Sequence, residues 1–236
     1  TVVPAVAGTL AAMAVCTVLG VVIERLAYKP LRQAPSLAVL ITAIGVSYFL
    51  QNAALLLWSS NPKAFTPVTG RGSLQVGPLS ISYVTLLTIA ACIIIMAVLT
   101  AFTSRTKLGK AMRAVSEDKG AAQLMGINVN ATISLTYAIG SALAAIDGVQ
   151  YMTSYPTLTH TTGSMPGIKA FTAAVFGGIG SIPGAMLGGL LLGIIEIFAG
   201  AYISTQLQNA IVFAVLIVVL LVKPAGLLGK MVQEKV

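Results

Sequence analysis

The chain has 236 residues, of which 57% are hydrophobic and only 8% are charged. A soluble domain carries roughly 25% charged residues, so this composition excludes a soluble enzyme or a soluble nucleic-acid-binding module. The net charge of +8 arises from 14 basic and 6 acidic residues. In a membrane protein we expect such an excess on cytoplasmic loops and not in a nucleic-acid groove.

Seven apolar segments are candidates for transmembrane or half-membrane helices. A helix needs about 20 apolar residues to cross the hydrocarbon core of a bilayer. In chain order the segments are residues 3–23, 37–58, 83–102, 132–153, 165–178, 184–201 and 208–222. The sequence therefore predicts an all-α polytopic membrane protein in which residues 1–236 form a single transmembrane domain.

The basic residues predict the orientation of these helices. Residues 24–36, residues 103–131 and the tail after residue 222 carry eleven of the fourteen Lys and Arg residues. If all seven segments cross or enter the membrane, these stretches lie on one side, which the positive-inside rule makes the cytoplasm. The loop of residues 59–82 is then outside.

Two adjacent amides and two acids inside the predicted helices are candidates for function. Gln51 and Asn52 are expected either to form hydrogen bonds between helices or to line a pore. Asp147 and Glu196 are acids in apolar segments, which makes each a functional hypothesis, although Asp147 could reach headgroup water and either acid could pair with Lys169. Both alternatives stay open at this point.

No metal site, redox pair or catalytic residue is expected. The two cysteines, Cys16 and Cys92, lie in apolar segments without a second thiol or a histidine close by in the sequence. We interpret both as small apolar residues.

A short amphipathic helix is predicted within the polar loop of residues 103–131. The two acids of this segment come before its apolar residues, and acids stabilise the positive N-terminal end of a helix. A glycine follows the apolar residues, and glycine commonly ends a helix. An apolar pair exposed in such a loop needs a partner protein, whereas the alternative is a solvated connector helix. The residues concerned are Glu117, Asp118, Ala121, Ala122, Leu124, Met125 and Gly126.

A break is predicted in the glycine-rich region of residues 165–201. The segment GGIGSIPG at residues 177–184 combines glycine with proline, which lacks an N–H group, so a continuous helix is disfavoured. At membrane depth such a break must be buried in protein or line a wet cavity.

Small residues recur every four positions near this break and in one other helix. They are Gly180, Gly184 and Gly188, then Gly189 and Gly193, and separately Gly140, Ala144 and Gly148. Close helix packing and a broken helix beside a translocation path both explain the pattern. Our candidates for the path or the break are Gln51, Asn52, Lys169, Thr172, Gly177, Gly178, Gly180, Ser181, Gly184 and Glu196.

Several segments resemble a known family. The pattern Glu117-Asp118-x-x-Ala121-Ala122-x-x-x-Gly126 resembles the loop by which ABC importer permeases dock a short coupling helix into a cleft of the ATPase subunit. The segments YKPLR (28–32), GIKAFTAAVFGGIGSIPGA (167–185) and KPAGLLG (223–229), with Glu196 after Gly193, resemble the LivH-type permeases of branched-chain amino acid importers. The resemblance covers roughly residues 22–230.

The resemblance implies a multi-pass permease subunit of an ATP-driven importer in the bacterial inner membrane, carrying branched-chain or related amino acids. It also implies the partners: a homologous LivM-type permease subunit, two ATP-binding ABC subunits and a periplasmic substrate-binding protein. Further N-terminal spans are expected as well, because permeases of this type carry more helices.

ATP and Mg²⁺ are expected on the partner ATPase subunits, with no cofactor on this chain. Gly109-Lys110 and Gly229-Lys230 lack the upstream Gly and the following Ser or Thr of a phosphate-binding loop. We therefore expect a transport subunit and not an enzyme. The alternative is an ion-coupled secondary transporter in which Asp147 and Glu196 bind the coupling ion.

Overall fold

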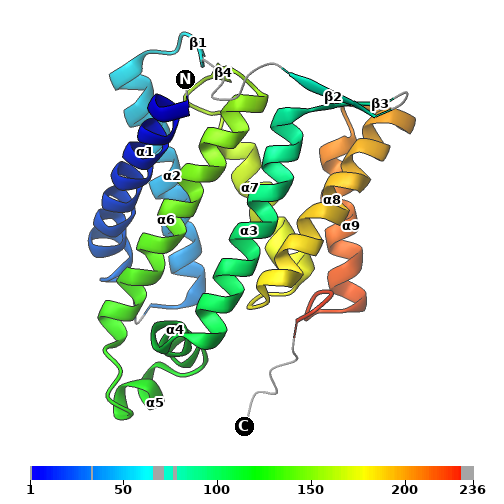
Figure 1. Cartoon of the computed structure of the whole chain (residues 1–236). Coiled ribbons are helices and arrows are strands. Elements are labelled where there is room, and N and C mark those ends of the chain that lie inside the picture. The colour runs from blue at the N-terminus through cyan, green and yellow to red at the C-terminus, as the bar shows by residue number, and fades with distance from the viewer. Residues whose placement is uncertain (1, 33, 66–71, 77–78, 230–236) are drawn as a thin grey trace. The chain divides into compact units, whose positions relative to one another are not determined.

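The computed structural model describes residues 2–32, 34–65, 72–76 and 79–229, and most of these residues are helical (Figure 1). Contacts divide the chain into two compact units, one made of Thr1–Ile94 with Ala101–Thr162 and the other of Ile95–Thr100 with Gly163–Val236. The helix α3 contributes residues to both.

The first unit contains six helices and a π-helical turn among its described residues. They are α1 (Val2–Ile23), the π-helix η1 (Glu24–Tyr28), α2 (Ser36–Trp58), most of α3 (Tyr83–Arg105), α4 (Lys107–Glu117), α5 (Lys119–Leu124) and α6 (Val129–Ser154). Figure 1 shows α4 and α5 at one end of α6, with short strands at the other end. This separation of the two loop regions agrees with the predicted sidedness of residues 59–82 and 103–131.

Two short antiparallel pairings occur in this unit, and the all-α prediction did not include them. The strand β1 (Lys63–Ala64) pairs with β4 (Thr157–Leu158), and β2 (Ser73–Val76) pairs with β3 (Leu79–Ser82). Strands of two to four residues are too short for an alternating pattern to reveal.

The second unit contains α7 (Ser164–Gly177), α8 (Ile182–Tyr202) and α9 (Gln208–Val222). All seven predicted segments of the chain are therefore helices. The largest shifts are three residues each: α3 continues to residue 105 through Thr103, Ser104 and Arg105, and α6 begins at residue 129.

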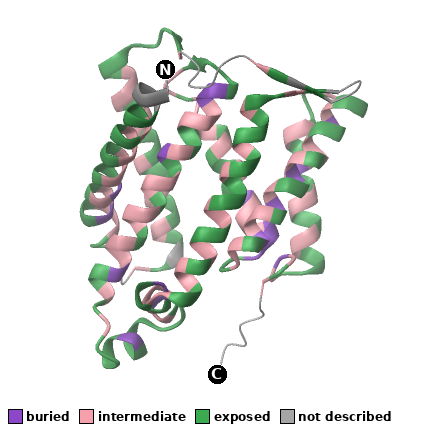
Figure 2. Ribbon diagram, in the orientation of Figure 1, coloured by how far each residue is buried: buried purple, intermediate pink, exposed green. Residues whose placement is uncertain are grey.

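Five helices within the described part of the chain are long and apolar enough to cross a membrane: Val6–Tyr28, Leu37–Trp58, Tyr83–Arg105, Val129–Ser154 and Ile182–Tyr202. The 14 residues of α7 span about 21 Å, less than the roughly 30 Å of the hydrocarbon core. None of the residues of α2 and α3 whose burial is described is buried; all are exposed or half-buried (Figure 2). Their apolar surfaces therefore need lipid or other protein chains around them.

The contact between α1 and α6 depends on a close approach at Gly20. A Cβ atom at this position would collide with the Ser141 side chain. On α6 the buried Ala145 lies one turn after Ser141. The predicted stripe of Gly140, Ala144 and Gly148 does not make this contact. All three are exposed, and a Cβ atom at either glycine would meet nothing within 4 Å. The predicted close packing through Gly140, Ala144 and Gly148 is therefore wrong, and the contact instead involves Ser141, one residue after Gly140.

The core of the second unit is formed by Phe176 of α7, Leu192 of α8 and Val212 of α9. These side chains are 4%, 5% and 1% exposed. Around them pack Ala173, Val215, Leu216, Val219 and Leu227. The core thus joins all three helices to the segment that follows α9.

Candidate functional site

Two hydrogen bonds at Thr106 and a close approach at Gly109 hold α4 against the end of α3 at a corner of the chain. The Thr106 hydroxyl donates to the Phe102 carbonyl oxygen at 2.7 Å and accepts from the backbone N–H of Gly109 at 3.0 Å. A side chain at Gly109 would collide with the backbone of Phe102 and Thr103. The predicted polar loop is therefore a packed helix at this end.

A second corner begins the short helix α5. The Asp118 carboxylate accepts hydrogen bonds from the backbone N–H groups of Gly120 and Ala121 at 2.7 and 3.0 Å, which is the geometry of an N-terminal cap. Glu117 is the last residue of α4 and lies outside α5. At the other end Gly126 has φ = +80°, a conformation that glycine adopts without strain.

The two faces of α5 differ sharply. Ala122 is 3% exposed, and its carbonyl oxygen accepts from the backbone N–H of Ile127 at 3.0 Å. Leu124 and Met125 are 91% and 82% exposed. The predicted helix is therefore present, its apolar pair faces outward, and Ala122 serves packing within the chain instead of offering a surface.

The predicted break lies between Gly177 and Ile182. The carbonyl oxygens of Phe176 and Gly177, at the end of α7, accept from the N–H groups of Leu227 and Leu228 at 2.9 Å each. Because a helix leaves its last carbonyls unsatisfied, the segment after α9 supplies the missing donors. The two ends of the break are thus buried in protein at Gly177, Gly178 and Gly184, whereas Ile179 and Gly180 between them are exposed.

Glycines let the backbones at this break come together. A Cβ atom at Gly184 would lie 2.5 Å from the Gly177 carbonyl oxygen, and one at Gly188 would lie 2.5 Å from the Ala173 carbonyl oxygen. Gly178 has φ = +109°, and a side chain there would collide with the backbone of Gly229. Gly180 does not take part in this packing, since nothing lies within 4 Å of its Cβ position.

Four other predicted residues make hydrogen bonds close to their own positions in the chain. Thr172 is 2% exposed and donates to the Ile168 carbonyl oxygen at 2.9 Å, while the Ser181 hydroxyl caps α8 by accepting from Gly184 N–H at 3.1 Å. Gln51 donates to Ser47 Oγ at 3.1 Å, and Asn52 donates to the Tyr48 carbonyl oxygen at 2.8 Å. Their part in a translocation path stays a prediction.

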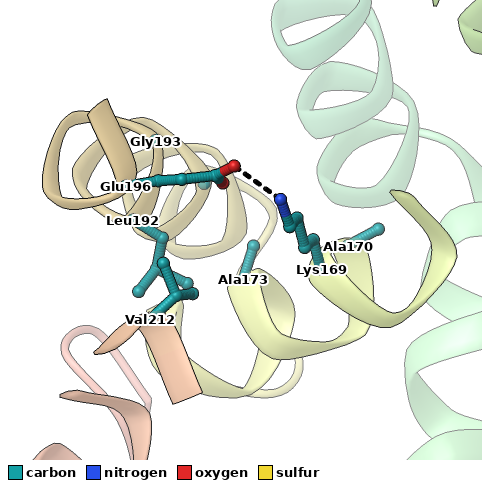
Figure 3. A pocket seen from close by; sticks show the side chains of 8 residues that line it. Lys169, Ala170, Ala173, Leu192, Gly193, Glu196 and Val212 are labelled. Atoms are coloured by element: carbon teal, nitrogen blue, oxygen red, sulfur yellow. Dashed lines mark hydrogen bonds and ion pairs between the residues drawn. The ribbon is translucent and has the colours of Figure 1, made fainter. Parts of the chain in front are cut away.

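Lys169 and Glu196 form an ion pair at the wall of a cavity in the second unit (Figure 3). The Lys169 Nζ lies 2.6 Å from Glu196 Oε1, and Gln208 Nε2 donates to the same oxygen at 3.4 Å. The cavity holds about 250 Å³ and is lined by Lys169, Ala170, Ala173, Gly189, Leu192, Gly193, Glu196 and Val212. The pairing of Glu196 with Lys169 is one of the alternatives that the sequence left open.

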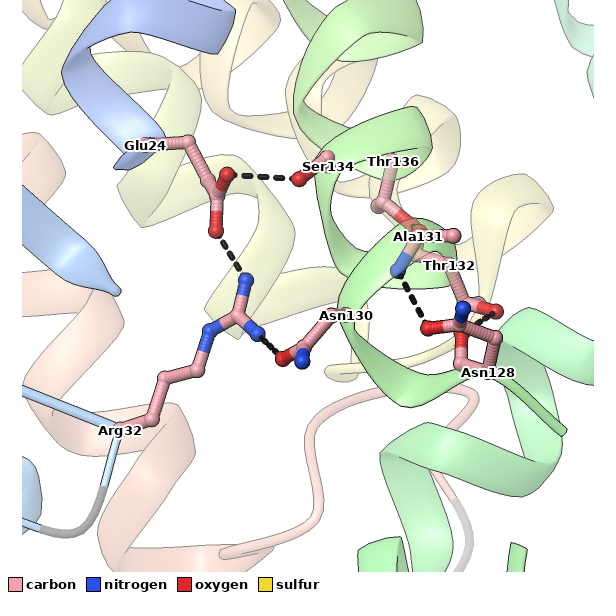
Figure 4. A network of polar contacts seen from close by, with 8 residues as sticks. All are labelled: Glu24, Arg32, Asn128, Asn130, Ala131, Thr132, Ser134 and Thr136. Carbon is pink, nitrogen blue, oxygen red and sulfur yellow. Dashed lines mark hydrogen bonds and ion pairs between the residues drawn. The ribbon is translucent and has the colours of Figure 1, made fainter. Parts of the chain in front are cut away.

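A buried acid that the sequence did not indicate lies where α1 meets η1. Glu24 is fully buried; its carboxylate pairs with Arg32 and accepts from the Ser134 hydroxyl at 2.7 Å (Figure 4). Arg32 also donates to the Asn130 side-chain oxygen. Asn128, two residues before Asn130, caps α6 by accepting from Ala131 N–H at 3.1 Å. The network thus ties η1 to the first turns of α6, directly after α5.

Removing Arg32 should destabilise the chain strongly, because the buried Glu24 carboxylate would lose its ion-pair partner. We expect Arg32→Met to lower the free energy of unfolding by about 3–5 kcal/mol. The double variant Glu24→Met with Arg32→Met, which removes both charges, should regain most of that loss. Thermal unfolding in detergent measures both. An unchanged melting temperature for Arg32→Met would show that the pair contributes nothing to stability.

Comparison with known proteins places the chain in a family. Residues 2–220 match the model of the branched-chain amino acid transport system permease component. The chain is 46% identical over 230 residues to the high-affinity branched-chain amino acid transport permease BraD of Pseudomonas aeruginosa, covering 96% of this chain and 75% of that protein. It is 45% identical over 235 residues to the corresponding permease LivH of Escherichia coli, covering 98% and 76%.

A more distant relative is the autoinducer 2 import permease LsrC of an Enterobacter strain, 30% identical over 169 residues and covering 69% of this chain and 45% of that protein. No solved structure matches the chain. The family model covers all five helices that are long enough to span a membrane. The chain therefore belongs to the family of branched-chain amino acid transport permease components, and it is a multi-pass inner-membrane protein.

Proposed function

We propose that this chain is a permease subunit of an ATP-driven importer, in which ATP and Mg²⁺ bind to partner ATPase subunits. A second, homologous permease subunit of the LivM type completes the membrane path. A periplasmic binding protein delivers a branched-chain or related amino acid to it. The relatives named for branched-chain amino acid transport support the substrate class.

The observation that carries this proposal is the exposed pair formed by Leu124, the last residue of α5, and Met125, which follows it directly. Both side chains are apolar and project from a helix that a cap at Asp118 and the buried Ala122 hold in place. Apolar side chains fixed outside a membrane-spanning helix are typical of a protein contact. We assign this surface, with the flanking Glu117, Ala121 and Gly126, to the ATPase subunit.

A continuous series of contacts leads from this surface to the membrane helices. From α5 the chain turns at Gly126, and Asn128 caps α6 two residues later. The Glu24–Arg32 pair then joins the start of α6 to the end of α1 through Asn130 and Ser134. Movement of α5 by the ATPase would therefore be passed to α1 and α6 together.

The ion-coupled alternative has no supporting observation. Glu196 forms an ion pair with Lys169. Asp147 is exposed on α6. Family membership favours the importer.

Uptake by proteoliposomes separates the two mechanisms. The chain, assembled with its permease and ATPase partners, should take up leucine from the binding protein only when ATP is present on the ATPase side. A protonophore should leave the initial rate unchanged. If the protonophore abolished uptake while ATP was held constant, the proposal would be wrong.

A further inference from the structure

The cavity beside Lys169 and Glu196 has two chemically different parts. One part is the ion pair, contributed by α7 and α8. The other part is an aliphatic wall made of Ala170, Ala173, Leu192 and Val212, as Figure 3 shows for the labelled side chains.

Both charged groups are accessible from the cavity. The side chains of Lys169 and Glu196 are 29% and 24% exposed, although each bonds to the other. Gly189 and Gly193 lie on the same face of α8 as Glu196, at spacings of seven and three residues, and add no side chain to the cavity. A small molecule can therefore reach the carboxylate and the ammonium group without displacing a core residue.

The charge balance of the cavity selects the kind of ligand. An unpaired charge is costly in a membrane-embedded segment, so a ligand that brings a net charge would leave one charge unpaired. A zwitterion brings one charge of each sign. Its carboxylate would pair with Lys169 and its ammonium group with Glu196. These two ion pairs would replace the single pair between Lys169 and Glu196, and the net charge of the cavity would stay at zero.

We infer that this cavity is a binding site for a zwitterionic α-amino acid with an aliphatic side chain. Lys169 Nζ holds the carboxylate, Glu196 holds the ammonium group, and the aliphatic side chain lies along the aliphatic wall, in which Ala170 and Ala173 are the more exposed residues and Leu192 and Val212 belong to the buried core. A cavity of about 250 Å³ lies just below the roughly 300 Å³ at which drug-sized ligand pockets begin, which suits so small a ligand. The inference rests on the proposed function and assigns it a substrate contact.

Ligands that lack one charge test this assignment. We would measure leucine binding to the purified transport assembly without its binding protein, with 4-methylpentanoate and leucinamide as competitors. The first lacks the ammonium group and the second lacks the carboxylate. The wild type should prefer leucine over each by about ten- to hundred-fold, the usual effect of losing one charged hydrogen bond.

Each single variant of the ion pair should lose the preference for leucine over one of the two competitors and keep the preference over the other. Glu196→Gln should bind 4-methylpentanoate nearly as well as leucine, and Lys169→Gln should do the same for leucinamide. A purely structural ion pair would not change these ratios. If both variants kept the wild-type preferences, the inference would be overturned.

The exchanged pair Lys169→Glu with Glu196→Lys serves as the control. It keeps an ion pair, so its melting temperature should match the wild type, but it reverses the polarity that the ligand meets, so leucine binding should fall at least about ten-fold. Wild-type binding in this variant would overturn the inference.

The uptake assay of the wild type, run in parallel, distinguishes this failure from a failure of the proposed function. If the binding experiments overturned the inference but the wild type still showed ATP-dependent leucine uptake, the proposed function would remain valid. Absence of that uptake in the wild type would overturn both.

Discussion

Replacing Gly188 with alanine is expected to destabilise the second unit, although it adds a single methyl group. Its Cβ atom would lie 2.5 Å from the Ala173 carbonyl oxygen and 2.8 Å from the Gly177 backbone nitrogen. Both are backbone atoms of α7, so neither can move away as a flexible side chain would. Overpacking of this kind costs about 1–3 kcal/mol, and thermal unfolding in detergent measures it.

The neighbouring glycine provides a matched control. A Cβ atom at Gly189 would lie 3.6 Å from the Ala173 side chain, an ordinary contact distance. Gly189→Ala should therefore leave the stability unchanged or raise it by up to about 1 kcal/mol, because alanine favours the helix. Equal melting temperatures for the two variants would contradict the close contact between α7 and α8.

The second large effect is expected at the outer face of α5. Leu124→Glu places a charge where we propose an apolar contact with the ATPase subunit. Truncation of a central interface residue costs 2 kcal/mol or more, so assembly should weaken by about 30-fold or more. Co-purification with the ATPase subunits and leucine-stimulated ATP hydrolysis should both fall.

Folding should persist in this variant, because the Leu124 side chain is 91% exposed. Leu124→Met is the control, since it keeps an apolar side chain of similar size. Ala122→Arg would not serve as a test, because Ala122 is 3% exposed and an arginine there would disturb the chain itself. If Leu124→Glu assembled with the ATPase subunits and hydrolysed ATP as the wild type does, the assignment of α5 to the interface would be wrong.

Much of the helical architecture was predictable because long apolar segments depend on local composition alone. The break after Gly177 was predictable for the same reason, since glycine and proline act on their own backbone. The short strands were not predictable. Their pairing partners, such as Lys63 and Leu158, lie far apart in the sequence and carry no distinctive pattern.

The buried Glu24 could not be predicted because its environment is assembled from distant segments. In the sequence it follows an apolar segment directly and has the character of a loop residue. Its burial depends on Arg32, eight residues later, and on Ser134, 110 residues later. The sequence pattern also does not show which face of α5 is buried. The burial of Ala122 and the exposure of Leu124 are therefore seen only in the structure.

The most direct test of the proposed importer is to prevent ATP hydrolysis in the complete assembly and to measure leucine uptake. Proteoliposomes containing this chain and its partners would receive the binding protein, radiolabelled leucine and either ATP or a non-hydrolysable ATP analogue. We predict rapid accumulation of leucine with ATP and none above background with the analogue. Equal accumulation under the two conditions would contradict the account, because the movement assigned to α5 would then not be driven by hydrolysis.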